Sequence, residues 1–144
     1  MAPRPAKKAN DIKYKLVKTL PANDVIALYT AAGWWENTPH NRRIIPKMVK
    51  NSMAFAVAKQ GKNTIGMGRV ISDGVSDGYI QDVTVLPAFR GRGIGQEIIR
   101  VLLGACAKKK LDWVGLVAEP GTYPFYRRLG FKDKQGFQLM LYKS

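Results

Sequence analysis

Cysteine and histidine are almost absent from this sequence. Its 144 residues include one cysteine, Cys106, and one histidine, His40. A single cysteine excludes a disulfide within the chain, and a zinc site built from cysteine and histidine would need ligands that the sequence lacks. The carboxylates also show no cluster at metal-ligand spacing. We therefore expect no disulfide framework and no metal.

Long apolar runs are missing as well. No run approaches the roughly 20 residues that span a bilayer. The basic start of the chain, residues 1–8, is not followed by the apolar segment of a signal peptide. We therefore expect a cytoplasmic protein. The length is that of a single domain, so the sequence predicts a flexible basic arm over residues 1–10 and one domain over residues 11–144.

Acidic residues are scarce: 10 stand against 24 lysines and arginines, which gives a formal charge of +14. Such a charge attracts nucleic acid, anionic cofactors, acidic proteins or anionic membranes, or only keeps the protein in solution. The basic residues cluster only at residues 1–8 and 108–110. A nucleic-acid-binding module would need clustered basic residues with interleaved aromatics. The leading hypothesis is therefore an enzyme, and a nucleic-acid-binding module is the alternative.

Hydrophobic periodicity predicts a mixed α/β domain of the α+β kind. Helical spacing and start or stop residues predict helices within residues 21–32, over 41–51, from Ile94 to the lysines at 108–110, and over 122–129. Branched, alternating segments between turn residues predict strands over 12–18, 53–59, 64–72, 79–86, 113–118, 131–134 and 137–142. The last two would close the sheet as a pair.

A glycine-rich turn follows the strand predicted at 79–86 and leads into a helix. Residues 90–95 read RGRGIG. Glycines allow close approach, and the free N–H groups of a helix start bind anions, with the two arginines adding charge-assisted contacts. The segment fits R-x-x-G-x-G and matches neither the dinucleotide fingerprint nor the P-loop. The alternative is a turn that only connects two elements.

Two separate blocks carry a family resemblance. The first is DVTVLP at 82–87 followed by RGRGIG at 90–95, and the second is EP at 119–120 followed by FYRRLGF at 125–131. In order and spacing they resemble the acetyl-coenzyme A motifs of the GCN5-related N-acetyltransferase (GNAT) family. The likeness covers roughly residues 53–142, and two blocks are far more specific than one. The first fifty residues match only in element type.

The resemblance implies how the cosubstrate acetyl-CoA would bind. The fourth strand would splay from the fifth in a V, and main-chain groups of Val83 and Val85 would pair with the pantetheine arm like an added strand. The N–H groups of residues 91–96 would hold the pyrophosphate. The binding set implied in this way is Val83, Thr84, Val85, Arg90, Gly91, Arg92, Gly93, Ile94, Gly95, Gln96, Glu119 and Tyr126. An amine acceptor and the option of a homodimer also follow from the resemblance.

Tyr126 is the candidate general acid. When an amine attacks a thioester, coenzyme A leaves as a thiolate that must be protonated. A tyrosine with its ordinary pKa of about 10 can protonate a thiolate whose thiol has a pKa of about 8.5. The N–H of Val85 could polarise the carbonyl. The alternative for Tyr126 is an aromatic side chain that only packs.

Asp82 is the candidate general base, because strand alternation separates its side chain from those of Val83 and Val85. Glu36, His40 and a chain of water molecules stay open as alternatives. Cys106 lies on an apolar helical face and is expected in the core, so no acetyl-cysteine intermediate is expected.

The acceptor is less defined. Trp34, Trp35 and Glu36 stand in the loop that borders the acceptor site in the family, although large aromatics also cap cores. Some protein-lysine acetyltransferases of the family carry a glutamate where this chain has Tyr79. The second block also resembles the arylalkylamine branch of plants and cyanobacteria. A small amine is therefore the favoured acceptor; the alternatives are a protein N-terminus or lysine, and a member that binds coenzyme A without turnover.

Overall fold

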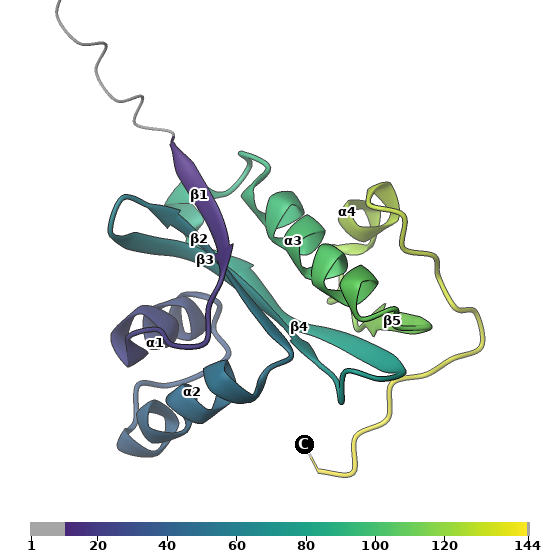
Figure 1. Ribbon diagram of the computed structural model, residues 1–144, viewed down its shortest axis with the longest axis horizontal. Coiled ribbons are helices and arrows are strands. Elements are labelled where there is room, and N and C mark those ends of the chain that lie inside the picture. The colour runs from purple at the N-terminus through teal and green to yellow at the C-terminus, as the bar shows by residue number, and fades with distance from the viewer. Residues whose placement is uncertain (1–10, 144) are drawn as a thin grey trace, which may run out of the picture.

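The computed structural model describes residues 11–143, so the arm predicted for residues 1–10 lies outside the described residues. Figure 1 shows the elements along the chain. In order they are β1 (Ile12–Leu16), α1 (Ala22–Ala31), α2 (Pro39–Asn51), β2 (Ala54–Gln60), β3 (Asn63–Ile71), β4 (Asp77–Val85), the 3-10 turn η1 (Pro87–Phe89), α3 (Ile94–Lys108), β5 (Trp113–Leu116) and α4 (Tyr123–Arg128).

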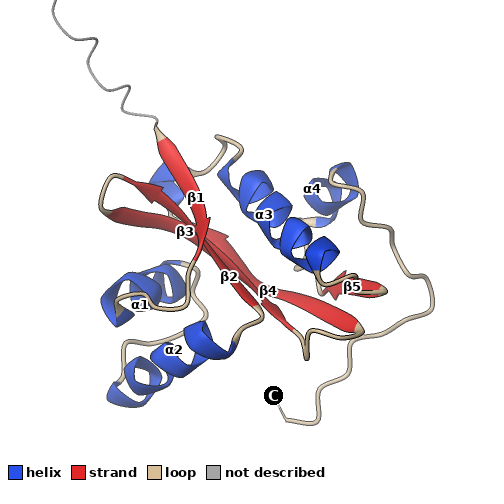
Figure 2. Ribbon diagram, viewed as in Figure 1, coloured by secondary structure: helices blue, strands red, loops and turns tan. Residues whose placement is uncertain are grey.

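The five strands form one sheet in the order β1-β2-β3-β4-β5. The first three pairings are antiparallel, and β4 and β5 are parallel. Figure 2 shows α1 and α2 on one face of the sheet and α3 on the other. The predicted mixed, mostly antiparallel sheet flanked by helices is confirmed.

The sheet opens between β4 and β5. Their parallel ladder runs from the pair Asp77–Trp113 to the pair Ile80–Leu116 and stops there. β4 continues to Val85, and within the described chain residues 81–85 have no strand partner on that edge. The expected splay between the fourth and fifth strands is therefore present, with one open edge of β4 facing it.

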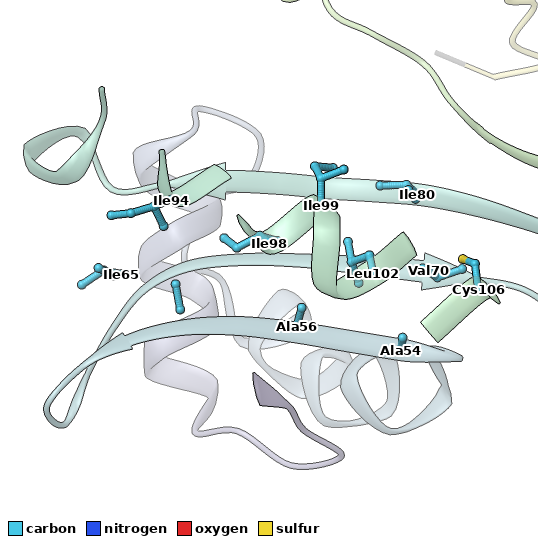
Figure 3. Packing of buried hydrophobic residues seen from close by; sticks show 11 residues of the cluster. Ala54, Ala56, Ile65, Val70, Ile80, Ile94, Ile98, Ile99, Leu102 and Cys106 are labelled. Carbon is cyan, nitrogen blue, oxygen red and sulfur yellow. The ribbon is translucent and has the colours of Figure 1, made fainter. Parts of the chain in front are cut away.

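Helix α3 is held against the sheet by an apolar stripe at helical spacing. Ile94, Ile98, Leu102 and Cys106 are all buried and point at β2, β3 and β4 (Figure 3). Gly66 on β3 allows this close approach, since a Cβ there would lie 2.8 Å from Cδ1 of Ile98. The predicted core position of Cys106 is confirmed.

Helices α1 and α2 cover the opposite face with a second apolar cluster. Tyr29, Ile45 and Val49 are buried there against Phe55 and Met67. α2 begins earlier than predicted because Thr38 caps it, accepting a 3.1 Å hydrogen bond from the Asn41 N–H. Pro46 stands inside this helix without ending it.

The predicted pair of strands at 131–134 and 137–142 is wrong. Residues 131–143 contain no strand, and the side chains from Phe137 to Tyr142 are exposed. Only Phe137 of this apolar segment meets the sheet by a ring contact, 6.5 Å from Trp113. β5 is only four residues long, so its outer edge has few main-chain groups with which a further strand can form hydrogen bonds.

No helix within residues 11–143 has the length and apolar character needed to span a membrane.

Candidate active site

A cavity of about 340 Å³ lies where β4 and β5 part. Its wall is formed by residues from β4, from the segment after β5 and from the loop after α1. These residues are Trp34, Tyr79, Ile80, Gln81, Asp82, Val83, Val117, Glu119 and Thr122. The structure thus brings together four residues of the predicted site: Trp34, Asp82, Val83 and Glu119.

Asp82 projects from a β-bulge in β4. Met67 pairs with Thr84 and Arg69 with Gln81, so that Gly68 alone stands opposite Asp82 and Val83. The backbone of Asp82 is left-handed, with φ of 59°, a conformation that few non-glycine residues adopt. A Cβ at Gly68 would lie 3.0–3.1 Å from three side chains, which would have to shift to admit it.

The carboxylate of Asp82 is held by two donors. The Tyr29 hydroxyl and Nε of Arg69 each donate a 2.7 Å hydrogen bond to the same oxygen, Oδ2. Arg69 also forms an ion pair with it, and both side chains are largely buried. Val83, the next residue, packs towards α3. The bulge interrupts the regular alternation expected here, and both residues line the cavity.

Trp34 lines the cavity on the side of α1. Its Nε1 donates a 3.1 Å hydrogen bond to Oε1 of Glu119, in the segment after β5. Trp35 lies outside the cavity and stacks on Tyr29, with ring centroids 4.3 Å apart. Glu36 is also outside its lining, and its carbonyl accepts a hydrogen bond from the Asn41 side chain. Of the three expected acceptor residues, the cavity contains one.

The charge of the cavity is opposite to that of the chain. Two of the ten acidic residues, Asp82 and Glu119, line it, whereas no lysine or arginine of the described residues does. Since Arg69 compensates the charge of Asp82 from behind, Glu119 leaves the cavity with a net negative charge.

The open edge of β4 presents main-chain groups to the splay. The Leu86 N–H donates a 2.8 Å bond to the Ile65 carbonyl on β3. Because successive residues of a strand direct their N–H and C=O groups to opposite edges, the groups of Val83 and Val85 face the splay and those of Thr84 face β3. Nε of Arg90 donates to the Val85 carbonyl at 3.0 Å.

The glycine-rich turn leads directly into α3. Gly91 and Gly93 have φ of 78° and 79°, and Gly93 is the N-cap of the helix. Such angles favour glycine. Ile94 is buried as the first residue of α3, whereas Arg90 and Arg92 are exposed. The turn therefore offers free helix N–H groups and two exposed cations beside the open edge.

Tyr126 lies on α4 and not in the lining of the cavity. Its ring meets Phe125 and Phe131 edge-on, with centroids 5.0 Å and 5.8 Å away. Burial, and to a smaller extent the charge of Glu119, raise the pKa of the Tyr126 phenol. The phenol therefore keeps its proton throughout the neutral range.

His40 is exposed in the first turn of α2 and does not line the cavity. Among residues 11–143 no three histidine, cysteine or acidic side chains come together as a group that could hold a metal ion.

Two side chains beside Asp82 carry no signal in the sequence. Tyr29 belongs to the apolar stripe of α1, and its spacing indicated only a core residue. Arg69 stands in a strand with no motif around it. Their contacts join residues 53 and 13 positions apart, which periodicity within one element does not reveal.

A mixed sheet that opens between two parallel strands, beside a glycine-rich turn and a helix N-terminus, is the arrangement that the resemblance to coenzyme A-dependent acetyltransferases implied. Residues 51–133 match the family model described as an acetyltransferase (GNAT) domain, and the chain belongs to this family. Dependence on acetyl-CoA is general to the family, so the chain is an N-acetyltransferase of that kind.

Individual relatives agree with this assignment. The chain is 29% identical over 137 residues to an uncharacterized N-acetyltransferase, ycf52, of Pyropia yezoensis, covering 92% of this chain and 77% of the relative. It is 34% identical over 134 residues to the histone acetyltransferase TAP1 of Glycine max, covering 83% of this chain and 55% of the relative. Among solved structures, AAC(6')-Iy in complex with a CoA-containing bisubstrate analog aligns with a TM-score of 0.74 at 14% identity, over 94% of this chain and 99% of that one.

Proposed function

We propose that this acetyltransferase transfers the acetyl group of acetyl-CoA directly to a small cationic primary amine. The observation that carries the proposal is the acidic cavity: two carboxylates and no described basic residue line it, in a chain with 24 basic residues. An ammonium group is attracted to such a site, and a phosphorylated or carboxylated acceptor is repelled.

The cosubstrate fits beside this cavity. The N–H and C=O groups of Val83 and the N–H of Val85 face the splay, where they can pair with the pantetheine amides as a strand pairs at a sheet edge. The free N–H groups at the start of α3, with Arg90 and Arg92, suit the pyrophosphate. Since Arg90 contacts the Val85 carbonyl at 3.0 Å, we expect it to leave that group when the pantetheine arm arrives.

The proposed chemistry assigns one step to each of three groups. Oδ1 of Asp82 takes a proton from the ammonium, and the amine nitrogen then attacks the acetyl carbonyl carbon. The Val85 N–H polarises the carbonyl oxygen. The carbon–sulfur bond breaks as Tyr126 gives its phenolic proton to the sulfur. The second proton lost by the nitrogen restores the phenol, and the proton held by Asp82 goes to solvent, so that one proton is released per turnover.

The aromatic walls favour an acceptor with an apolar body. Trp34 and Tyr79 both line the cavity, and an aromatic face attracts cations as well as apolar groups. An arylalkylamine has both features. A protein lysine is the second candidate, because it is also a cationic primary amine and a soybean relative is named a histone acetyltransferase.

A panel of acceptors tests the proposal, with release of free coenzyme A as the readout. The panel contains an arylalkylamine, a polyamine, a phosphorylated amino sugar and a lysine-containing histone peptide. We expect the arylalkylamine to have the highest kcat/KM and the phosphorylated sugar to be inert. Highest activity on the peptide would favour the lysine alternative.

Calorimetry with acetyl-CoA and with a DNA duplex at physiological salt tests the remaining alternatives. We expect binding of acetyl-CoA. Acetyl-CoA binding without turnover on any amine would favour a coenzyme A-binding protein, and binding to the duplex alone would overturn the enzyme hypothesis. The cytoplasmic location stays a prediction.

A further inference from the structure

The backbone of Asp82 places its carboxylate in a conformation that needs support. The left-handed φ of 59° lies at the bulge opposite Gly68, and a non-glycine residue keeps such a conformation only where its surroundings hold it. Both supporting donors, the Tyr29 hydroxyl and Arg69, reach Oδ2. No hydrogen bond from the described residues reaches Oδ1, which leaves that oxygen for an acceptor amine.

The ring of Tyr29 connects this carboxylate to the loop after α1. It is 1% exposed, lies parallel to Trp35 at 4.3 Å, and meets Trp34 edge-on at 6.2 Å. Trp34 in turn lines the cavity and contacts Glu119. Tyr29 therefore contacts both tryptophans with its ring and the carboxylate with its hydroxyl.

We infer that Tyr29 is a positioning residue, which fixes the direction of the Asp82 carboxylate and connects it to the adjacent tryptophans Trp34 and Trp35. The inference rests on the role of Asp82 in the proposed function. Arg69 supplies charge compensation, and the tyrosine hydroxyl supplies direction. Because a short displacement of a reacting group costs much of its rate advantage, loss of this hydroxyl affects the chemical step more than acceptor binding.

Tyr29→Phe tests the inference, because it removes the hydroxyl and keeps the ring stacked on Trp35. We expect kcat to fall about tenfold, while KM for the amine and the affinity for acetyl-CoA stay within about twofold. Tyr14→Phe is the matched control: Tyr14 on β1 packs against the other core, and its hydroxyl makes no hydrogen bond in the described chain. It should leave kcat unchanged.

A double-mutant cycle separates positioning from a structural role. If the hydroxyl acts through the carboxylate, Tyr29→Phe causes no further fall in kcat in an Asp82→Asn background. An equal fall in both backgrounds would show a structural effect and overturn the inference. Should Tyr29→Phe not fold, Trp35→Leu removes the stacking partner instead, and its loss of kcat should likewise vanish beside Asp82→Asn.

The same measurements distinguish this inference from the proposed function. Unchanged kcat in Asp82→Asn would remove the assigned role of Asp82, and with it the inference. A large fall in kcat for Asp82→Asn together with an unchanged kcat for Tyr29→Phe would refute positioning by Tyr29. The proposed role of Asp82 in acetyl transfer would then still stand.

Discussion

The indole N–H of Trp34 donates a 3.1 Å hydrogen bond to Oε1 of Glu119, across 85 residues of sequence. It joins the loop after α1 to the segment after β5, and both residues line the cavity. Gly33 and Gly121, their near neighbours, have φ of 76° and 88°. One side of the cavity is therefore bounded by a polar contact between two loops that turn at glycines.

Trp34→Phe removes this contact and keeps an aromatic ring at the cavity. We expect KM for the amine to rise about threefold with kcat unchanged, since a net hydrogen bond contributes about 0.5–1.5 kcal/mol and this one shapes the binding site. Steady-state kinetics at saturating acetyl-CoA measure both constants. Trp113→Phe, at an exposed tryptophan beside Phe137, is the control. Equal KM values for both variants would contradict the prediction.

Tyr126→Phe removes the proposed acid. We expect kcat to fall about 100-fold, in the range typical of general acids, with an unchanged affinity for acetyl-CoA measured by calorimetry. Since burial, and to a smaller extent Glu119, raise the pKa of this phenol above its ordinary value, no loss of kcat in the neutral range should come from ionisation of Tyr126.

Tyr123→Phe is the matched control for that experiment. Tyr123 stands three residues earlier on α4, is exposed, and has the Arg127 guanidinium over its ring. Both variants lose a phenol from the same helix. If they reduce kcat equally, Tyr126 has no specific role as an acid.

Residue spacing correctly predicted the elements that depend only on interactions within one segment. The stripe from Ile94 to Cys106 and the glycine turn before it predicted α3 and its buried face, because both depend on spacing within one segment. The bulge at Asp82 depends on pairing with Gly68, fourteen positions away, and alternation alone predicted a regular strand. The segment from Phe137 to Tyr142 alternates like a strand, but strand formation also requires a paired edge.

The sequence likewise predicted some residues of the site and misplaced others. The motif blocks identified Asp82, Glu119 and the turn at 90–96. Trp35 was expected in the acceptor pocket, although its ring instead stacks on Tyr29. A loop of adjacent tryptophans shows that aromatics are present, but not which ring faces the cavity, because that choice is made by the packing of α1.

Gly93→Ala tests the glycine turn as an anion site. No atom lies within 4 Å of the added methyl group, so the change acts only through φ of 79°. A left-handed alanine costs about 1–2 kcal/mol, and we expect acetyl-CoA affinity to fall about tenfold. Gly74→Ala, with φ of 82° and equally open space, should lose similar stability without changing acetyl-CoA binding. Calorimetry on both variants measures the difference.

Gly68→Ala tests the close packing behind the bulge. Its methyl group would lie 3.0 Å from side-chain atoms of Ile98 and Leu102, so we expect a loss of about 1–3 kcal/mol in urea unfolding. Gly104→Ala on α3 has no atom within 4 Å and should gain about 0.5–1 kcal/mol, because glycine weakens a helix interior. A stable Gly68→Ala variant would argue against the tight contact of α3 with β3.

Tyr29 also predicts how stability changes at high pH. Burial, followed by the charge of Asp82 and its hydrogen bond, raises the pKa of the Tyr29 phenol far above its ordinary value of 10. Above pH 10 the unfolded chain releases this proton and the folded chain keeps it, so the folded state binds more protons and its stability falls as pH rises. Tyr29→Phe has no such proton.

We expect the difference in unfolding free energy between wild type and Tyr29→Phe to be constant from pH 7 to pH 9 and to shift in favour of the variant above pH 10. Urea unfolding at pH 8 and pH 11 measures this shift. Tyr142→Phe, whose side chain is 98% exposed, should show no pH-dependent difference, and a constant difference for Tyr29→Phe up to pH 11 would mean that its phenol is not held by Asp82 in solution.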